Sequence, residues 1–387
     1  MKKKHNFVRL AEVQLAQGTL YCGGLDPHDF CSLEKNKKIY LHGSPNVDRW
    51  QMYYEILGLL GFSVGTIYDS PWNIKDGTER NRFAAFLAGV EEYIIRVIDI
   101  LVNKCNIRVF KPQAAFFEQF GPMGNIMLAR IRAHIKKIEK EKDIRLICLL
   151  DCKRGDIKTT QAMYLLGLLG NLKESWGIDY APYDFDIINV TPWMGSDVMA
   201  FTDDNGGEGK GLKLVREGKG LIVVNKSSNP SGLEYQEMQI VGKEKTLQMC
   251  NVDDVYRMSL ELELEYENLS ALGLVVGSTH ICDGSIRKAF PTTTLLVPGF
   301  GAQGGKFNKI MLELIRSGKW NGLGAIFSSS RGTMYPFIEK YGGSGKIENL
   351  ENDLMKAISK FREAEEAAYS ASEVVNAGII YPFKKTA

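Results

Sequence analysis

The sequence has few residues that could build a metal site, and none of them stands in a typical metal-binding arrangement. It contains seven cysteines and five histidines in 387 residues. The cysteines are odd in number and widely scattered, without a Cys-x-x-Cys pair, and no two histidines have the spacing of metal ligands. A structural zinc site is therefore not expected. The cysteines are expected to be reduced and mostly buried, as is usual inside the cell.

Long apolar segments and a large net charge are also missing. A membrane-spanning helix needs about 20 consecutive apolar residues, and no stretch of the chain approaches that length. The basic start at 2–4 resembles the beginning of a signal peptide, but Arg9 and Glu12 interrupt the apolar segment that should follow. The net charge of +2 favours neither nucleic acid nor a membrane surface as a partner. We expect a cytoplasmic protein that binds neither of them.

What the sequence does contain is a globular composition and a repeated alternation of secondary structure. Hydrophobic residues make up 44% and charged residues 24% of the chain, which is enough apolar material for a large core. Eight short apolar runs, rich in Val, Ile and Leu, show no clear alternation of polar and apolar positions, which is typical of parallel strands buried on both faces. The expected strands are Thr19–Leu25, Ile107–Phe110, Ile144–Leu150, Phe185–Val190, Gly220–Val224, Gly273–Val276, Thr293–Val297 and Gly324–Ser328.

Amphipathic segments between these runs predict helices. The clearest are Arg80–Leu101, Asn125–Lys140, Asp253–Leu272 and Phe307–Arg316. Eight strands that alternate with helices indicate an α/β fold, a (β/α)₈ TIM barrel. We expect a single domain over residues 1–387, with insertions near 27–79, 202–219 and 230–252 and an outer C-terminal helix near 348–371.

The strongest local signal follows the third expected strand, where the sequence reads Asp-Cys-Lys-Arg-Gly-Asp over 151–156. Asp151 and Lys153 are two residues apart in a strand and therefore share a face at its carboxyl end, where barrels place their active sites. Asp156 follows after a glycine. The spacing alone is weak, because it should occur by chance in roughly one chain in ten of this length. The alternative interpretation is a surface ion pair at the end of a strand.

A further lysine ends the second expected strand. Lys111 should reach the same rim of the barrel as Asp151 and Lys153, and alternating opposite charges hold one another ionised. A protonated lysine can deliver a proton to a carbanion, and a neighbouring aspartate can repel a substrate carboxylate. Taken alone, Lys111 is equally well explained as a rim residue that extends its ammonium group to solvent.

A phosphate site is expected at the ends of the last two strands. A glycine-rich stretch at 298–305 follows the seventh strand, and Ser330 and Arg331 follow the eighth. Glycine-rich backbone, a helix N-terminus and an arginine together can hold phosphate, and barrels commonly do so between these two loops. The glycine spacing also matches a dinucleotide-binding motif, with Arg331 available for the 2′-phosphate of NADP. An NADP-binding oxidoreductase is disfavoured because only one strand follows these glycines.

Two more strand ends carry polar residues. Asp26 follows the first strand and is suited to a sugar hydroxyl, and Ser228 follows the fifth strand and is suited to the edge of a heterocycle. Each residue taken alone is at least as well explained as a turn residue with its polar group satisfied locally.

Taken together, the runs at the strand ends resemble the orotidine 5′-phosphate decarboxylase family. They cover seven of the eight strand ends, in the family's order, over about 20–335. The resemblance is strongest to the subgroup with the motif Phe-Lys-Pro-x-x-Ala-Phe-Phe-Glu, which stands here at 110–118. The runs that carry it lie at 22–27, 110–121, 151–157, 191–195, 227–230, 298–305 and 328–332.

The resemblance implies a homodimer with shared active sites. It also implies conversion of orotidine 5′-phosphate to UMP, in de novo pyrimidine biosynthesis, without a metal or an organic cofactor. Lys153 would protonate C6 of the pyrimidine, Asp151 would lie against the departing carboxylate, and Lys111 would complete the charge network.

Other roles follow from the resemblance residue by residue. Asp156 would enter the partner's site with Ile157 and Thr160. The expected substrate contacts are Asp26 to ribose, Ser228 to the base, and Gln303 with Arg331 to phosphate, together with Gln113, Thr191, Pro298 and Ser330.

The sequence departs from the family pattern at three of these loops. Gln113 stands where the subgroup often has asparagine, Gly24 where valine is common, and Ser330 where glycine is frequent. The insertion at 27–79 has no counterpart in compact members. The absence of a phosphoribosyltransferase signature indicates a monofunctional chain.

Two further functions compete with this one. Sugar-phosphate decarboxylases and synthases of the same superfamily share the Asp-x-Lys-x-x-Asp end but depend on Mg²⁺. An adhesion function through Arg154-Gly155-Asp156 is disfavoured, because the tripeptide lies inside the expected catalytic loop and no secretory segment accompanies it.

Overall fold

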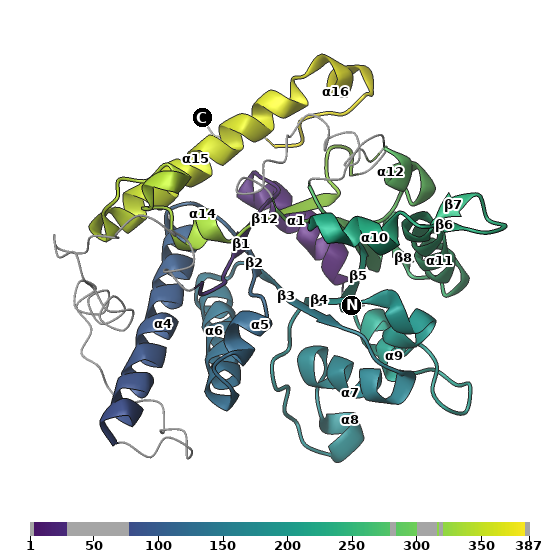
Figure 1. Ribbon diagram of the computed structural model, residues 1–387, viewed down its shortest axis with the longest axis horizontal. Helices are drawn as coiled ribbons and strands as arrows, with labels where there is room; N and C mark the ends of the chain where they lie inside the picture. Colours follow the sequence, from purple (N-terminus) through teal and green to yellow (C-terminus); the bar gives the residue numbers. More distant parts are fainter. Residues whose placement is uncertain (1–3, 29–76, 279–283, 300–315, 317–319, 384–387) are drawn as a thin grey trace.

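The computed structural model describes residues 4–28, 77–278, 284–299, 316 and 320–383 (Figure 1). Its centre is a closed barrel of parallel strands in the order β1-β12-β11-β10-β5-β4-β3-β2. The strands are β1 (Tyr21–Gly24), β2 (Val109–Lys111), β3 (Ile147–Arg154), β4 (Ile187–Val190), β5 (Gly220–Lys226), β10 (Leu272–Val276), β11 (Leu295–Val297) and β12 (Ala325–Ser329). Each overlaps one of the eight predicted strands, so the predicted barrel fold is confirmed.

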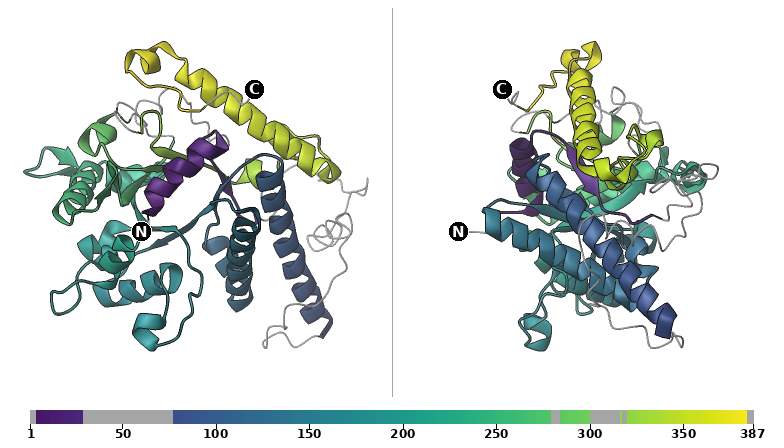
Figure 2. Two further views of the ribbon diagram at one scale, coloured as in Figure 1. Left: turned by 180° about the vertical axis from the view of Figure 1, so that it is seen from behind. Right: turned by 90° about the vertical axis from the view of Figure 1, so that its left-hand side faces the viewer.

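Helices surround this barrel in both views of Figure 2. The longest are α4 (Gly77–Asn103), α6 (Pro122–Lys142), α11 (Leu247–Glu261) and α15 (Leu350–Tyr369). Shorter ones are α5 (Ala115–Glu118), α7 (Lys158–Leu169), α8 (Lys173–Trp176), α9 (Lys210–Arg216), α10 (Leu233–Gln236), α12 (Ser285–Ala289), α14 (Arg331–Met334) and α16 (Ser372–Asn376), with 3-10 helices at Pro192–Met199 (η1), Pro230–Gly232 (η2), Glu339–Tyr341 (η3) and Ile347–Asn349 (η4). No helix in the described part of the chain is long and apolar enough to cross a membrane.

The amino end of the barrel is closed by a helix that precedes the first strand, α1 (Asn6–Gln17). Three of its side chains, Phe7, Leu10 and Val13, are buried in a cluster with inward-facing strand residues such as Ile147 and Ile222. Burial of an aromatic or aliphatic side chain of this size contributes about 1.5–3 kcal/mol. This end of the barrel, the floor, is therefore held by apolar packing.

The start of α1 is fixed by a buried histidine. His5 accepts a hydrogen bond from the backbone N–H of Phe7, and its Nε2 lies 2.8 Å from the carbonyl oxygen of Lys219. Burial lowers the pKa of His5 to about 3. The imidazole therefore stays neutral at physiological pH and acts as a structural cap.

One predicted helix is wrong over its second half. Asp253–Leu272 was expected to be one helix, but α11 ends at Glu261 and a short hairpin follows, β8 (Glu265–Tyr266) with β9 (Leu269–Ser270). The two residues between these strands, Glu267 and Asn268, have φ angles of 53° and 66°. Neither is glycine, so the usual sequence signal for such a turn is missing.

The predicted insertions contain regular structure where they are described. Helix α9 lies within 202–219, and 230–252 contains η2, α10, a hairpin of β6 (Gln239–Ile240) with β7 (Lys245–Thr246), and the start of α11. Most of the insertion at 27–79 lies outside the described residues, as does the helix expected over Phe307–Arg316 except for its last residue. Helix α15 occupies the range of the expected C-terminal helix.

Candidate active site

The carboxyl ends of β2 and β3 bring a buried lysine against a buried aspartate. Lys111 is 3% exposed and Asp151 is 7% exposed. The backbone extends the pairing beyond β2, because the N–H of Asp151 donates to Pro112 and the N–H of Ala114 donates to Asp151. The Nζ of Lys111 lies 3.1 Å from Oδ2 of Asp151 as a result. This pair lies at the predicted rim, so two of the expected site residues meet.

The second lysine approaches the same aspartate from the other side. The Nζ of Lys153 is 2.5 Å from Oδ1 of Asp151, and the Lys153 side chain is 46% exposed. Lys153 has a φ of 45°, in the left-handed region that is unusual for a residue with a side chain. The register between β3 and β4 shifts between Leu150 and Arg154, on either side of this residue. The kink gives both Asp151 and Lys153 access to one site.

An asparagine of β4 that the sequence interpretation missed holds this kink. Asn189 is 1% exposed, and its Nδ2 donates to Oδ1 of Asp151 over 2.7 Å. Its Oδ1 accepts hydrogen bonds from the backbone N–H groups of Cys152 and Lys153, at 2.8 and 2.7 Å. One amide thus fixes both the carboxylate and the strained backbone. The available signal was a polar residue near the carboxyl end of the apolar run at 185–190, which also contains Asp186.

The charges of this cluster hold one another ionised. Burial would lower the pKa of Lys111, but the negative charges of Asp26 and Asp151 outweigh it and raise that pKa well above its usual value. Burial would likewise raise the pKa of Asp151, but Lys111 and Lys153 hold it well below its usual range. Lys111 and Asp151 are therefore charged at every pH at which the protein is expected to work.

Asp26 lies just beyond the end of β1 and is also buried, with 5% of its surface exposed. Its Oδ2 accepts a hydrogen bond from the hydroxyl of Ser330, which follows β12. The pKa effect on Lys111 shows that Asp26 acts on the same charge cluster. The expected residues Asp26 and Ser330 are therefore together, beside the Lys111–Asp151 pair.

The motif at 110–118 contributes more than its lysine. Gln113 forms an isolated bridge with Asp151, and its side chain accepts a hydrogen bond from the N–H of Ala115 over 2.6 Å. Glu118 forms an ion pair with Arg154, which follows Lys153 at the end of β3. These contacts tie the loop after β2 to the loop after β3.

The residues expected to reach a partner lie apart from this cluster. Asp156 is half-buried, and its carboxylate accepts a hydrogen bond from the adjacent N–H of Ile157 over 2.7 Å. Among the described residues, Asp156 has no ion pair with Lys111 or Lys153. Ile157 is 55% exposed, and Thr160 is exposed on the first turns of α7.

The remaining expected contacts follow other strands. Thr191 donates a hydrogen bond from Oγ1 to the carbonyl of Lys153 over 3.1 Å and so supports the backbone at the end of β3. The backbone of Ser228 lies against Gly277, where an added Cβ would be 2.6 Å from the Ser228 Cα. Pro298 follows β11 and accepts from the N–H of Ser278, and Arg331 opens α14. Gln303 lies outside the described residues.

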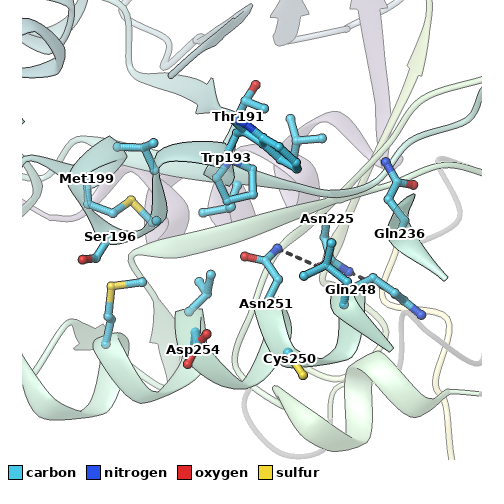
Figure 3. Close-up of a pocket in the computed structure, with 18 of the residues that line it drawn as sticks. Thr191, Trp193, Ser196, Met199, Asn225, Gln236, Gln248, Cys250, Asn251 and Asp254 are labelled. Carbon is cyan, nitrogen blue, oxygen red and sulfur yellow. Dashed lines mark hydrogen bonds between the residues drawn. The ribbon is translucent and has the colours of Figure 1, made fainter. Parts of the chain in front are cut away.

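A cavity of about 890 Å³ lies next to this array, between η1, β5 and α11 (Figure 3). Thr191 and Trp193 form one wall, and Asn251 on α11 faces them across the cavity. Three of its amides bond to one another, since Asn225 donates to Gln248 over 3.3 Å and accepts from Asn251 over 2.8 Å. Lys111, Asp151 and Lys153 do not line it, so this cavity neighbours the charged site without including it.

Within the described ranges, no group of three or more His, Cys, Asp or Glu residues is arranged to hold a metal ion. The five cysteines in those ranges, at 22, 105, 148, 152 and 250, are buried and free of disulfide bonds.

The strands form a closed parallel barrel, and lysines and carboxylates gather at their carboxyl ends. This arrangement defines the class of protein: a TIM-barrel enzyme with its polar site in the usual position. The family model described as orotidine 5′-phosphate decarboxylase / HUMPS matches residues 92–331. The chain therefore belongs to this family. The predicted membership is confirmed, and with it the predicted class of enzyme, a carboxy-lyase.

Two curated relatives named orotidine 5′-phosphate decarboxylase illustrate the similarity. The protein from Rhodopirellula baltica is 30% identical over 263 residues, which cover 67% of this chain and 78% of the relative. The protein from Caldicellulosiruptor bescii is 32% identical over 248 residues, which cover 64% and 73%.

Solved structures show the same fold at lower identity. Plasmodium berghei orotidine 5′-monophosphate decarboxylase superimposes with a TM-score of 0.61 at 16% identity, covering 96% of this chain and 100% of that one. Leishmania donovani OMP decarboxylase gives a TM-score of 0.55 at 20% identity, covering 95% and 99%.

Proposed function

We propose that this chain decarboxylates orotidine 5′-phosphate to UMP and carbon dioxide, as a step of pyrimidine biosynthesis in the cytoplasm. The observation that carries the proposal is the Lys111–Asp151–Lys153 array in a member of this family. Its two lysines contact opposite oxygens of one carboxylate, at 3.1 and 2.5 Å. Such an array matches a reaction in which a carboxylate is lost as neutral CO₂ and its negative charge moves onto carbon.

In the proposed reaction, the bond between C6 of the pyrimidine and its carboxylate breaks. The electron pair stays on C6, CO₂ departs, and the Nζ of Lys153 gives its proton to C6. No oxidant or reductant is needed, because the electron pair remains in the product. General acid catalysis of this kind commonly contributes about 10²- to 10⁴-fold in rate.

Asp151 has two effects in this proposal. It orients the ammonium group of Lys153, because the two groups are in hydrogen-bond contact. Its negative charge, held by Lys111 and Lys153, would also lie against the substrate carboxylate and favour its loss. Lys111 keeps Asp151 ionised and fixes its second oxygen.

The surrounding loops would bind the rest of the nucleotide. Asp26 would take ribose hydroxyls, and Ser228 would read the edge of the base. Arg331 with Gln303 would hold the phosphate at the helix start that follows β12. Gln113, Thr191, Pro298 and Ser330 would complete the lining of the site.

We further propose that the enzyme is a homodimer with shared active sites. The support is the loop after β3, where Asp156 does not join the charge cluster of its own chain and Ile157 is an exposed apolar residue. In the dimer, Asp156, Ile157 and Thr160 would reach the ribose and base bound by the partner.

The test is a UV assay that follows the loss of orotidine 5′-phosphate, with and without EDTA. We expect turnover that EDTA leaves unchanged. The second candidate is a Mg²⁺-dependent sugar-phosphate decarboxylase or synthase, which the HUMPS part of the family description favours. Turnover of a sugar phosphate that EDTA abolishes, without loss of orotidine 5′-phosphate, would support this candidate and reject ours.

A further inference from the structure

The ends of β1 and β12 approach each other unusually closely. These strands pair in parallel, with Gly23 opposite Ser329, so Gly24 and Ser330 are neighbours at the mouth of the barrel. A Cβ added at Gly24 would lie 2.3 Å from the Oγ of Ser330 and 2.7 Å from its Cα. Real Cβ atoms are never that close to other atoms, so only glycine at position 24 leaves room for the Ser330 side chain.

The Ser330 hydroxyl uses this room to bond a buried carboxylate. It donates to Oδ2 of Asp26, a residue that is only 5% exposed. The other oxygen, Oδ1, is fully buried and has no hydrogen-bond donor among the described residues. A buried carboxylate oxygen without a donor is costly, so its presence in a native structure needs an explanation, and a donor supplied by a ligand is one.

We propose that Ser330 is a positioning residue: it holds the Asp26 carboxylate so that Oδ1 is presented to a hydroxyl of the substrate's sugar. This role rests on the proposed function, in which Asp26 binds ribose. It differs from the expected role of Ser330 in lining the phosphate end, because the hydroxyl is already committed to Asp26. Ser330 thereby determines how strongly the site distinguishes a ribonucleotide from a deoxyribonucleotide.

The role predicts a selective loss of affinity. In the variant Ser330→Ala, the Asp26 carboxylate loses its fixed donor and can rotate away from the sugar. The affinity for UMP should fall about 10-fold, the size of one hydrogen bond to a charged group. The affinity for the analogue that lacks the contacted hydroxyl should change less than about twofold, because that contact is already missing.

The experiment measures dissociation constants by calorimetry for UMP, 2′-deoxyUMP and 3′-deoxyUMP, so that each hydroxyl is removed in turn. The proteins are the wild type, Ser330→Ala, Asp26→Asn and the double variant. If Ser330 acts through Asp26, its substitution should add almost nothing in the Asp26→Asn background. Ser359→Ala is the matched control, because Ser359 also donates to a carboxylate, that of Glu363, but on the outer helix α15.

Two results would overturn the inference. One is an equal loss of affinity for UMP and both deoxy analogues in Ser330→Ala, which would indicate a general disturbance of the pocket. The other is full additivity of the two substitutions. Failure of the proposed function looks different: the wild type would then neither bind UMP nor consume orotidine 5′-phosphate, and the inference would fall with it.

Discussion

The two ends of the barrel each bury a carboxyl group, and the two groups have opposite pKa shifts. At the mouth, Asp151 is held between Lys111 and Lys153 and its pKa lies well below the usual range. At the floor, Glu365 of α15 accepts a hydrogen bond from the N–H of Leu20, just before β1, and burial raises its pKa to about 7. No lysine or arginine of the described residues forms an ion pair with Glu365. Both carboxyl groups are buried, so the lysines beside Asp151 account for the difference between the two pKa shifts.

The mouth and the floor of the barrel also differ in what their side chains contribute to the protein. The floor is closed by Phe7, Leu10 and Val13 of α1, which are buried among apolar strand residues. The mouth is built from paired charges, and the cost of removing them from water offsets most of their mutual attraction, so they add little net stability to the fold. Substitutions at the mouth should therefore reduce activity, and substitutions at the floor should reduce stability.

The largest expected effect is at the mouth, in the variant Lys153→Ala. We expect kcat for orotidine 5′-phosphate to fall by at least about 10³-fold, because the proton donor is gone. The free energy of unfolding should change by less than about 1 kcal/mol, since this side chain is half-exposed. The measurements are steady-state kinetics and urea unfolding.

The control for that variant is Lys137→Ala, which removes an exposed lysine of α6 that pairs with Glu141. It should retain wild-type kcat. Retention of a large share of the activity by Lys153→Ala would show that another group supplies the proton and would end the proposed mechanism.

The next largest effect is expected at the floor, in the variant Phe7→Ala. Phe7 is 1% exposed, and truncation of a buried aromatic side chain usually costs about 3–5 kcal/mol. The urea midpoint should fall accordingly, while kcat per folded molecule should stay within about twofold of wild type. A large loss of kcat in a fully folded sample would show that the two ends are coupled. It would contradict the assignment of activity to the mouth and stability to the floor.

The smallest of the three effects is the pH dependence caused by Glu365. Its pKa is about 7 in the folded chain, whereas that of an unperturbed glutamate is 4.5. Between these two values the unfolded chain loses the proton while the folded chain keeps it, so stability falls as pH rises. The full penalty, about 3 kcal/mol, is present above about pH 7.

Glu365→Gln keeps the shape and removes the charge. Its free energy of unfolding should match the wild type near about pH 5 and exceed it by up to about 3 kcal/mol near about pH 8. Urea unfolding at several pH values would show this, with Glu363→Gln on the exposed face of α15 as the control. Parallel pH profiles for wild type and Glu365→Gln would mean that this carboxyl is ionised in the folded protein.

Most of the barrel could be predicted from the sequence, because a strand buried on both faces shows itself as a short run of Val, Ile and Leu. The hairpin β8–β9 could not, because its turn uses Glu267 and Asn268 and lacks glycine. Helix α9 was missed for a related reason: its seven residues, Lys210–Arg216, follow a long glycine-rich loop and are too few for a clear helical period.

The site was predictable where it depends on position along a strand and was missed where it depends on register between strands. Lys111, Asp151 and Lys153 stand at strand ends, so their convergence follows from the barrel fold alone. Asn189 reaches Asp151 only because β3 and β4 pair with Leu150 opposite Ile188. The close approach of Gly24 to Ser330 likewise depends on the register between β1 and β12. Neither register can be derived from a single strand.

The unequal exposure of the two lysines has a consequence for repeated turnover. After each proposed reaction cycle the donor lysine is left neutral and must regain a proton from water. Lys111 is 3% exposed and enclosed by carboxylates, whereas nearly half of the Lys153 side chain is in contact with solvent. Of this pair, only Lys153 can be recharged directly from bulk water between one substrate and the next.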